Sequence, residues 1–308
     1  MVSKVSMAVD LGGIKMKNPV NTASGTFGQG WQFQGFMDVS RLGAITVKGC
    51  AAEPWPGNPA PRMAEVPSGM LNTVGLQNPG VAGLVEESGG YLEELAAAGT
   101  AVICQVVGHS VDEYTAALEL YEELCPWAAG FELNVSCPNL EAGGATIGST
   151  PEGAASVLRA CRPLTERPLI VKMAPVNVPE TARALEAEGA DALSLINTIP
   201  AMKIDVGSRK SKLSRPTGGL SGPAIHPIAV RMVWEAASAV EIPICGMGGV
   251  MGWEDAAELI LAGATSVAVG TASFSDPTAS IKVLEGLESW AESQGASDIN
   301  ELVGAFEC

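Results

Sequence analysis

The residues best suited to chemistry lie between Asn134 and Asn139, where the sequence reads Asn-Val-Ser-Cys-Pro-Asn. Two amides flank one thiol, and because amides both donate and accept hydrogen bonds, they suit a substrate that carries imide and carboxylate groups. A lone cysteine is more often a small buried hydrophobe than a reactive group. Here an apolar run over 128–135 leads into the segment and Pro138 prevents its continuation, so Cys137 is expected where a strand becomes a loop. Barrel enzymes place their catalytic residues at such strand ends.

Two glycine-rich segments at expected strand ends, 246–249 and 269–271, could bind a phosphate. Glycine lets backbone N–H groups approach a phosphate closely, and barrel enzymes bind phosphates at this location. Glycine is also common in ordinary turns, so each segment alone is weak evidence, whereas the two together favour a phosphate site. The residues expected around the phosphate are Ser221, Gly222, Gly248, Gly249, Gly270 and Thr271.

Lys48 and Lys172 lie just after or within apolar runs, and Asn197 and Thr198 follow another such run. Burying an unpaired ammonium group is costly, so lysines in a barrel mouth are expected to be functional. With the amides, the thiol and the phosphate site, they fit FMN held over the barrel and a flat polar substrate stacked on it. One lysine could stabilise the anionic reduced flavin. The same lysines leave a non-redox alternative open, a Schiff-base lyase that uses Lys172 or Lys48.

The elements that must position these residues alternate between helix and strand. A helix that ends at glycine and a strand that starts at once recur along the chain, as at Gly43, Gly99 and Gly189. Eight strands are expected near residues 20, 45, 103, 133, 171, 193, 244 and 267, and helices over 111–124, 151–162, 179–188, 224–239 and 253–261. This alternation predicts an α/β fold, a closed (β/α)8 TIM barrel in a single domain over residues 1–308. A short N-terminal hairpin over 5–20 is expected to close the bottom of the barrel, and long insertions are expected at its C-terminal face.

The two long insertions are the connections 49–81 and 198–223. Long structureless loops in compact domains are usually lids or binding loops. The second connection concentrates positive charge in an acidic protein, in Lys203, Arg209, Lys210, Lys212 and Arg215. This cluster could screen an anionic substrate or form a solvated loop, and the sequence leaves both interpretations open.

Composition restricts the class of protein further. The net charge of −16 with 18 Lys and Arg argues against nucleic acid and anionic membranes as partners. A hydrophobic fraction of 47% and a charged fraction of 17% describe a globular chain and not a disordered one. The seven cysteines include no CxxC pair and the chain has two histidines, so a metal or iron–sulfur site is not expected. Without an apolar run of about 18 residues or a signal-peptide pattern, we expect a cytoplasmic protein.

Nine segments, taken together and in order, resemble the dihydroorotate dehydrogenase family. They are residues 23–28, 46–49, 71–80, 134–139, 171–172, 196–198, 217–223, 246–249 and 269–271. A cysteine in the active loop is similar to class 1 of that family, and the run GLQNPG over 75–80 is similar to the class 1B catalytic subunit. Class 1A, a fumarate-using homodimer, usually reads GLPN there.

The resemblance implies FMN-dependent oxidation of (S)-dihydroorotate to orotate in pyrimidine biosynthesis. Cys137 would remove the C5 proton while hydride leaves C6 for the flavin. The substrate-binding residues implied are Lys48, Asn72, Thr73, Val74, Gly75, Leu76, Asn134, Asn139, Asn197 and Thr198. The flavin-binding residues implied are Ser24, Lys48, Gly49, Gln105, Asn134, Lys172, Ile196, Ser221, Gly222, Gly248, Gly249, Gly270 and Thr271.

The resemblance also implies partners. A class 1B chain forms the homodimeric core of a heterotetramer with a subunit that carries FAD and a 2Fe-2S cluster and passes electrons to NAD. The alternatives are a fumarate-dependent class 1A-like enzyme, a related flavin barrel that acts on another dihydropyrimidine, and a non-catalytic flavin-binding component of an electron-transfer complex. Two positions depart from the family pattern. Gln105 stands where an asparagine is expected, and Pro200 could stiffen the substrate loop.

Overall fold

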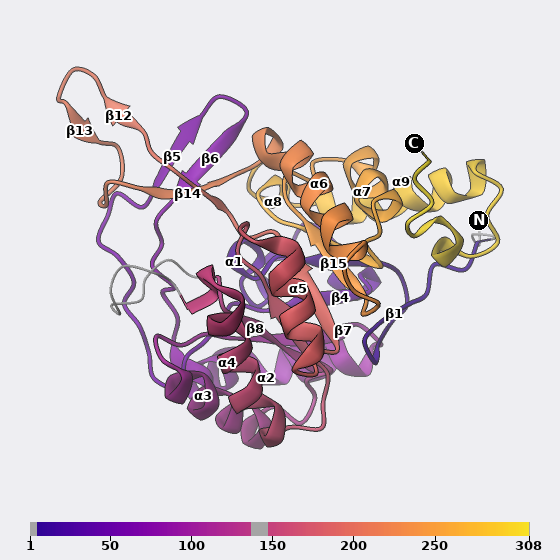
Figure 1. Ribbon diagram of the computed structural model, residues 1–308, viewed down its shortest axis with the longest axis horizontal. Helices are drawn as coiled ribbons and strands as arrows, with labels where there is room; N and C mark the ends of the chain where they lie inside the picture. Colours follow the sequence, from indigo (N-terminus) through magenta and orange to yellow (C-terminus); the bar gives the residue numbers. More distant parts are fainter. Residues whose placement is uncertain (1–4, 137–146, 308) are drawn as a thin grey trace.

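A parallel barrel of eight strands forms the centre of the computed structural model, which describes residues 5–136 and 147–307 (Figure 1). The predicted Cys137 and Asn139 therefore lie outside the described residues. The strands follow the order β3-β16-β15-β10-β9-β8-β7-β4. Their bounds are Val20–Thr22 (β3), Ala44–Thr46 (β4), Ala101–Val106 (β7), Gly130–Asn134 (β8), Leu169–Lys172 (β9), Ala192–Leu195 (β10), Ile244–Met247 (β15) and Ser266–Val269 (β16). The predicted TIM barrel and all eight of its expected strands are confirmed.

The barrel closes between β3 and β4, the two ends of the strand order. Gly43 N donates to Val20 O at 3.1 Å, and inside the barrel Asn21 Nδ2 donates to Thr46 Oγ1 at 3.0 Å. Gly43 must be glycine, because a Cβ there would lie 1.9 Å from Asn18 O.

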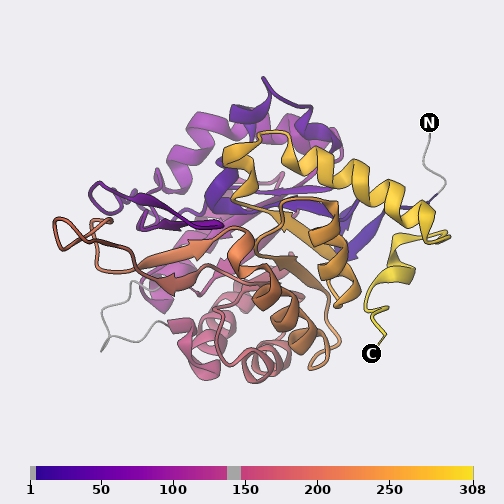
Figure 2. The same cartoon turned by 90° about the horizontal axis from the view of Figure 1, so that it is seen from above.

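Helices surround the strands in both views (Figures 1 and 2). The longer ones are Gly80–Ala97 (α2), Val111–Leu124 (α3), Pro151–Cys161 (α4), Val178–Ala187 (α5), His226–Ala237 (α6), Trp253–Leu261 (α7) and Ala279–Ser293 (α9). Polar side chains start two of them, since Ser110 Oγ accepts from Glu113 N at 3.3 Å and Thr150 Oγ1 accepts from Gly153 N at 3.1 Å. The five helices expected from the sequence are confirmed to within about two residues at each end.

Short elements complete the chain. The helical turns are Ser24–Phe27 (α1), Trp31–Phe33 (η1), Val39–Arg41 (η2), Ile147–Ser149 (η3), Arg162–Leu164 (η4), Pro223–Ile225 (η5), Ala272–Ser275 (α8) and Ile299–Leu302 (η6). The expected N-terminal hairpin is present as Val9–Leu11 (β1) and Ile14–Met16 (β2), with Leu11, Ile14 and Met16 buried. In the described part of the chain, no helix is long and apolar enough to span a membrane.

The two long connections are not structureless, which corrects the expectation from sequence. They pair with each other in an antiparallel sheet of order β11-β14-β6-β5, built from Met63–Val66 (β5), Gly69–Asn72 (β6), Ile199–Ala201 (β11) and Gly218–Ser221 (β14). The basic segment adds a second hairpin, Ile204–Asp205 (β12) with Lys210–Ser211 (β13). The small sheet and this hairpin project together from one side of the barrel (Figure 1). Pro200 lies in the edge strand β11, where its missing N–H costs no interstrand bond.

Candidate active site at the carboxyl ends of the barrel strands

A continuous series of hydrogen-bonded side chains runs from inside the barrel to its carboxyl end. Gln105 on β7 donates from Nε2 to Glu132 Oε1 at 2.5 Å, and Ser194 on β10 donates to Glu132 Oε2 at 2.7 Å. Asn134, two residues beyond Glu132 on β8, donates from Nδ2 to Gln105 Oε1 at 3.3 Å. Side chains two residues apart on a strand share a face, so Glu132 and Asn134 both point into the barrel. The predicted residues Gln105 and Asn134 are thus brought together.

The series continues beyond the strands through Ser136. Its hydroxyl donates to Asn134 Oδ1 at 2.8 Å and accepts from Asn197 Nδ2 at 2.5 Å. Asn197 Oδ1 in turn accepts from Thr198 N at 2.8 Å. The predicted Asn134, Asn197 and Thr198 therefore belong to one polar assembly, in which Ser136 is the residue directly before Cys137.

Lys172 lies at the end of β9, between Asn134 and Ser194 in strand register, and is 6% exposed. Burial raises the pKa of the neighbouring Cys245 thiol to about 12, with the Glu132 carboxylate raising it further and the Lys172 ammonium lowering it. Both charges therefore act inside the barrel on the same thiol. Lys172 therefore brings a buried positive charge to the carboxyl end of β9.

The small sheet brings a second set of predicted residues to the barrel mouth. Asn72 pairs in register with Gly219, and its Nδ2 donates to Gly219 O at 3.3 Å. Gly219 also lies against Thr198, because a Cβ at Gly219 would come within 2.0 Å of Thr198 Oγ1. Asn72 and Thr198 thus meet through Gly219, although about 125 residues separate them in sequence.

The adjoining residues 73–76 contact a different segment, the loop around Asn58. Asn58 Nδ2 donates to both Thr73 O and Thr73 Oγ1 at 3.1 Å, and Asn58 N donates to Val74 O at 3.0 Å. Gly75 has φ +72°, and a Cβ there would lie 2.7 Å from Asn58 N. Leu76 has φ +54° and its carbonyl accepts from Asn78 Nδ2. These contacts order the loop without joining it to the barrel amides.

Arg215 from the basic cluster reaches the same loop, donating from Nε to Asn58 Oδ1 at 3.3 Å. Lys212 pairs with Asp205 in the β12–β13 hairpin, and Lys203 donates to Glu65 O. Two of the five basic residues therefore have contacts within the small sheet and its hairpin and a third contacts the loop around Asn58, which favours a structural role for them over screening of a substrate.

The glycines expected to bind a phosphate gather at the ends of β14, β15 and β16. A Cβ at Gly249 would lie 2.8 Å from Gly222 O, and one at Gly248 would lie 3.3 Å from Ile196 Cγ1. Gly270 follows β16 beside Ala23, the residue before Ser24. Among the described residues, no protein acceptor is bonded to the backbone N–H of Gly248, Gly249 or Gly270. Free N–H donors at adjacent strand ends fit a phosphate group.

The remaining predicted residues lie beside the amides of the barrel and the glycines expected to bind a phosphate. Lys48 follows β4, and its N–H donates to Gly28 O at 2.8 Å. Gly49 packs on Gln105, since a Cβ there would lie 2.5 Å from Gln105 Oε1. Ser24 is buried at the start of α1, Ser221 ends β14, and Thr271 precedes α8.

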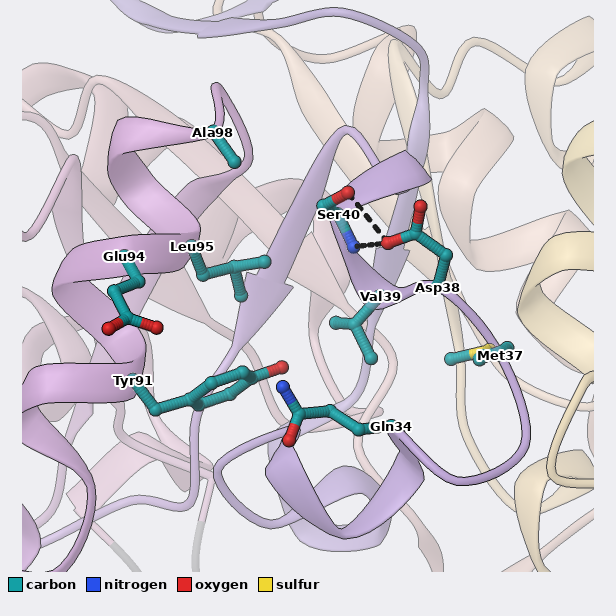
Figure 3. A pocket seen from close by; sticks show the side chains of 9 residues that line it. All are labelled: Gln34, Met37, Asp38, Val39, Ser40, Tyr91, Glu94, Leu95 and Ala98. Carbon is teal, nitrogen blue, oxygen red and sulfur yellow. Dashed lines mark hydrogen bonds between the residues drawn. The ribbon is translucent and has the colours of Figure 1, made fainter.

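A groove of about 280 Å³ lies elsewhere, between α2 and the segment 34–40 (Figure 3). Tyr91 and Gln34 point toward each other in it, and burial together with Asp38 raises the pKa of Tyr91 to about 12. Ser40 and Ala98 line the groove just before β4 and β7 begin, so it lies toward the amino ends of the strands. The chemistry of barrel enzymes belongs to the opposite face.

Sequence reasoning missed Glu132, Ser136 and Ser194, which hold the predicted amides in place. Glu132 offered a signal, because a carboxylate within an apolar strand must find partners when it is buried. Ser136 lies inside the motif 134–139 but carries no chemistry of its own. Ser194 gave no signal at all, since small hydroxyl residues are common in strands.

The barrel, with polar side chains and glycines at the carboxyl ends of its strands, has the architecture of (β/α)8 enzymes, which keep their active and phosphate sites at that face. The family model for dihydroorotate dehydrogenase matches residues 6–290. The chain belongs to the dihydroorotate dehydrogenase family. This membership confirms the resemblance and does not favour the Schiff-base lyase.

Full-length relatives agree with the family model. The chain is 47% identical over 306 residues to a protein from Trichlorobacter lovleyi, with 99% of both chains covered. It is 50% identical over 302 residues to one from Lachnoclostridium phytofermentans, covering 97% of this chain and 99% of the relative. A Bacteroides thetaiotaomicron protein is 46% identical over 303 residues, with 98% and 99% covered. Each relative is named dihydroorotate dehydrogenase B (NAD(+)), catalytic subunit.

Proposed function

We propose that this chain oxidises (S)-dihydroorotate to orotate in pyrimidine biosynthesis, as the catalytic subunit of an NAD-linked dihydroorotate dehydrogenase. The names of the full-length relatives support the reaction and its electron acceptor. The structural observation that supports the proposal is that the side-chain amides in the hydrogen-bonded series use only part of their hydrogen-bonding capacity on described residues.

Asn134 and Asn197 each use one N–H and one oxygen lone pair on described partners. A side-chain amide has two N–H bonds and two acceptor sites, so each asparagine retains one donor and one acceptor for a ligand. An adjacent donor and acceptor complement the –CO–NH– edge of a pyrimidine ring. Asn72 and Thr198, joined through Gly219, would face the same ligand, and Lys48 and Asn139 would contribute further contacts.

FMN, when bound, accepts a hydride equivalent from the substrate. Gly222, Gly248, Gly249, Gly270 and Thr271 would hold its phosphate, and the other residues expected near it are Ser24, Lys48, Gly49, Gln105, Asn134, Lys172, Ile196 and Ser221. The free N–H groups of the glycines and the buried cation of Lys172 fit that group. Lys172 would stabilise negative charge above β9.

Cys137 would accept the proton that leaves the substrate. A free thiol has a pKa near 8.5, so part of it is present as thiolate at neutral pH. The thiolate is a far stronger base than an alcohol, so a cysteine suits the role. General-base catalysis of this kind contributes about 10²–10⁴-fold to rate. Asn134, which is hydrogen-bonded to Gln105, and Asn197 would hold the pyrimidine ring beside that thiol.

The word subunit in the relatives' names supports a partner chain. We propose that this partner carries FAD and a 2Fe-2S cluster and passes electrons to NAD, in a heterotetramer built on a homodimer of this chain. The described residues include no group of three or more His, Cys, Asp or Glu that could hold a metal.

Anaerobic titration of the purified chain, loaded with FMN, with dihydroorotate tests the reaction. We expect the flavin absorbance to bleach, and NAD with the partner subunit, but not fumarate, to restore it. Recovery by fumarate alone would instead support a class 1A-like enzyme. A yellow protein that dihydroorotate does not bleach would contradict the substrate.

Cys137→Ser tests the base. We expect retained flavin with bleaching slowed at least about 100-fold at neutral pH. Cys308→Ser, which removes the other cysteine outside the described residues, is the matched control and should bleach at the wild-type rate. Bleaching of Cys137→Ser at that rate would remove Cys137 from the role.

A further inference from the structure

His226 occupies an unusual position beside the glycines expected to bind phosphate. It is the first residue of α6 and is 7% exposed, whereas the other histidine of the chain, His109, is exposed. Its Nδ1 lies 2.8 Å from Gly248 O. Its Nε2 faces α7, 3.4 Å from Glu258 Oε2 and 3.8 Å from Asp255 Oδ1.

The partners of the two ring nitrogens determine where the protons must lie. A carbonyl oxygen only accepts, so Nδ1 must carry hydrogen to bond Gly248 O. In a neutral ring Nε2 would then be a bare acceptor facing two carboxylates. Nε2 is buried and has no hydrogen bond among the described residues. The protonated ring removes this conflict, because it donates from Nδ1 and presents positive charge to Glu258 and Asp255.

The bond to Gly248 O also orients the next peptide group. The C=O of Gly248 and the N–H of Gly249 belong to one planar trans peptide and point in opposite directions. Holding the carbonyl toward the imidazole therefore turns the Gly249 N–H away from α6. Gly248 and Gly249, at φ +132° and +72°, would have wide rotational freedom without such a contact.

Asp255 fixes the other end of the same loop. Its Oδ2 accepts from Met251 N at 2.8 Å and Gly252 N at 2.9 Å, which leaves Oδ1 toward His226. The imidazole and this carboxylate together hold the loop 248–252 at both ends. The close packing of Gly249 on His226, where a Cβ would lie 2.7 Å from His226 Cβ, leaves the loop little room to shift.

We propose that His226, as an imidazolium held by Glu258 and Asp255, is a positioning residue that aims the Gly249 N–H at the phosphate of the bound flavin. The proposal rests on the proposed function in that it takes the phosphate to be that of FMN. It predicts tighter phosphate binding at pH values where the ring is protonated.

The test compares FMN with riboflavin, which has the same ring system without the phosphate, by fluorescence titration of the flavin-free full chain. His226→Gln should weaken FMN by about 10- to 50-fold, the effect of a lost charge-assisted hydrogen bond, and riboflavin by less than about 3-fold. Glu258→Gln changes a largely exposed side chain and should weaken FMN by about 2- to 5-fold. His109→Gln is the matched control and should change neither affinity.

The pH dependence gives a second readout. The dissociation constant of riboflavin divided by that of FMN should fall from pH 5.5 to pH 8, and it should fall more steeply in wild type than in His226→Gln. Comparing the two proteins removes the contribution of the phosphate's own titration, which is the same in both. Nitrogen-15 NMR of the flavin-free chain, with His109→Gln to assign the two rings, should show His226 protonated on both nitrogens at pH 6.

The outcomes separate two failures. Equal loss of FMN and riboflavin affinity in His226→Gln, unchanged FMN affinity, or a neutral ring at pH 6 would each overturn the role of His226. A wild-type chain that binds neither flavin would instead overturn the proposed function, and the NMR result would still report on the imidazole.

Discussion

Glu132 provides a direct measure of what the hydrogen-bonded series contributes to the barrel. Its carboxylate is 2% exposed and accepts from Gln105 Nε2 at 2.5 Å and Ser194 Oγ at 2.7 Å. Glu132→Ala leaves both donors buried without an acceptor, at about 1–3 kcal/mol each. We therefore expect a loss of about 4 kcal/mol in the free energy of unfolding. For 308 residues the unfolding entropy is about 0.65 kcal/mol/K, so the melting temperature should fall by about 6 °C.

Glu132→Gln separates the hydrogen bonds from the charge. The amide oxygen can accept from Gln105, and the amide N–H can donate to the Ser194 hydroxyl, which accepts as readily as it donates. No ion pair joins Glu132 to a cation within 4 Å in the described ranges, so we expect a change within about 1 kcal/mol. Glu93→Ala, an exposed carboxylate on α2, is the control for loss of charge.

Thermal unfolding of the flavin-free chain followed by circular dichroism measures these differences. A Glu132→Ala variant as stable as wild type would refute the energetic role of the series. A Glu132→Gln variant as unstable as Glu132→Ala would show that the negative charge, and not the pair of hydrogen bonds, is what the barrel requires.

Three further predictions concern Lys172, three buried cysteines and the cap of α4. Lys172→Ala should weaken FMN retention or slow reduction by dihydroorotate, and unaltered flavin content with an unaltered reduction rate would remove Lys172 from the site. Burial raises the pKa of Cys50 to about 11 and of Cys161 and Cys245 to about 12, so iodoacetamide at pH 8 should leave these three unmodified in the native chain. Mass spectrometry that finds them alkylated as fast as in urea would contradict this. Thr150→Ala removes the cap of α4 and should cost about 1 kcal/mol in unfolding, whereas Thr115→Ala on the exposed side of α3 should cost less.

The barrel was predictable because its signals are local. Ser110 and Thr150 start helices, Gly189 ends one, and apolar runs give the buried strands. The small sheet was not predictable in the same way. Its strands have three or four residues, contain glycine and proline, and pair Asn72 with Gly219, 147 residues further along the chain. No short pattern in either segment carries that information.

The site was partly predictable for a related reason. Residues that would touch a ligand, such as Asn134, Lys172 and Asn197, stand out as polar groups at the ends of apolar runs. Residues that hold them do not, because Ser136 and Ser194 acquire their roles only when β8 and β10 are brought together in the barrel. His226 shows no signal in sequence either, since its partners lie on α7 and after β15.

The acidic character of the chain does not conflict with the proposed binding of two anions, a carboxylate and a phosphate. Charges separated by more than a Debye length of about 8 Å are largely screened at physiological salt, so most of the net charge of −16 has little effect at the barrel mouth. What a ligand meets there is local. Lys172 is buried at the end of β9, and the N–H groups of Gly248, Gly249 and Gly270, after β15 and β16, have no acceptor among the described residues. Inside the barrel, Glu132 already has both oxygens bonded to neutral donors, so its charge is stabilised without an ion pair to Lys172, and that ammonium remains available for the proposed ligand.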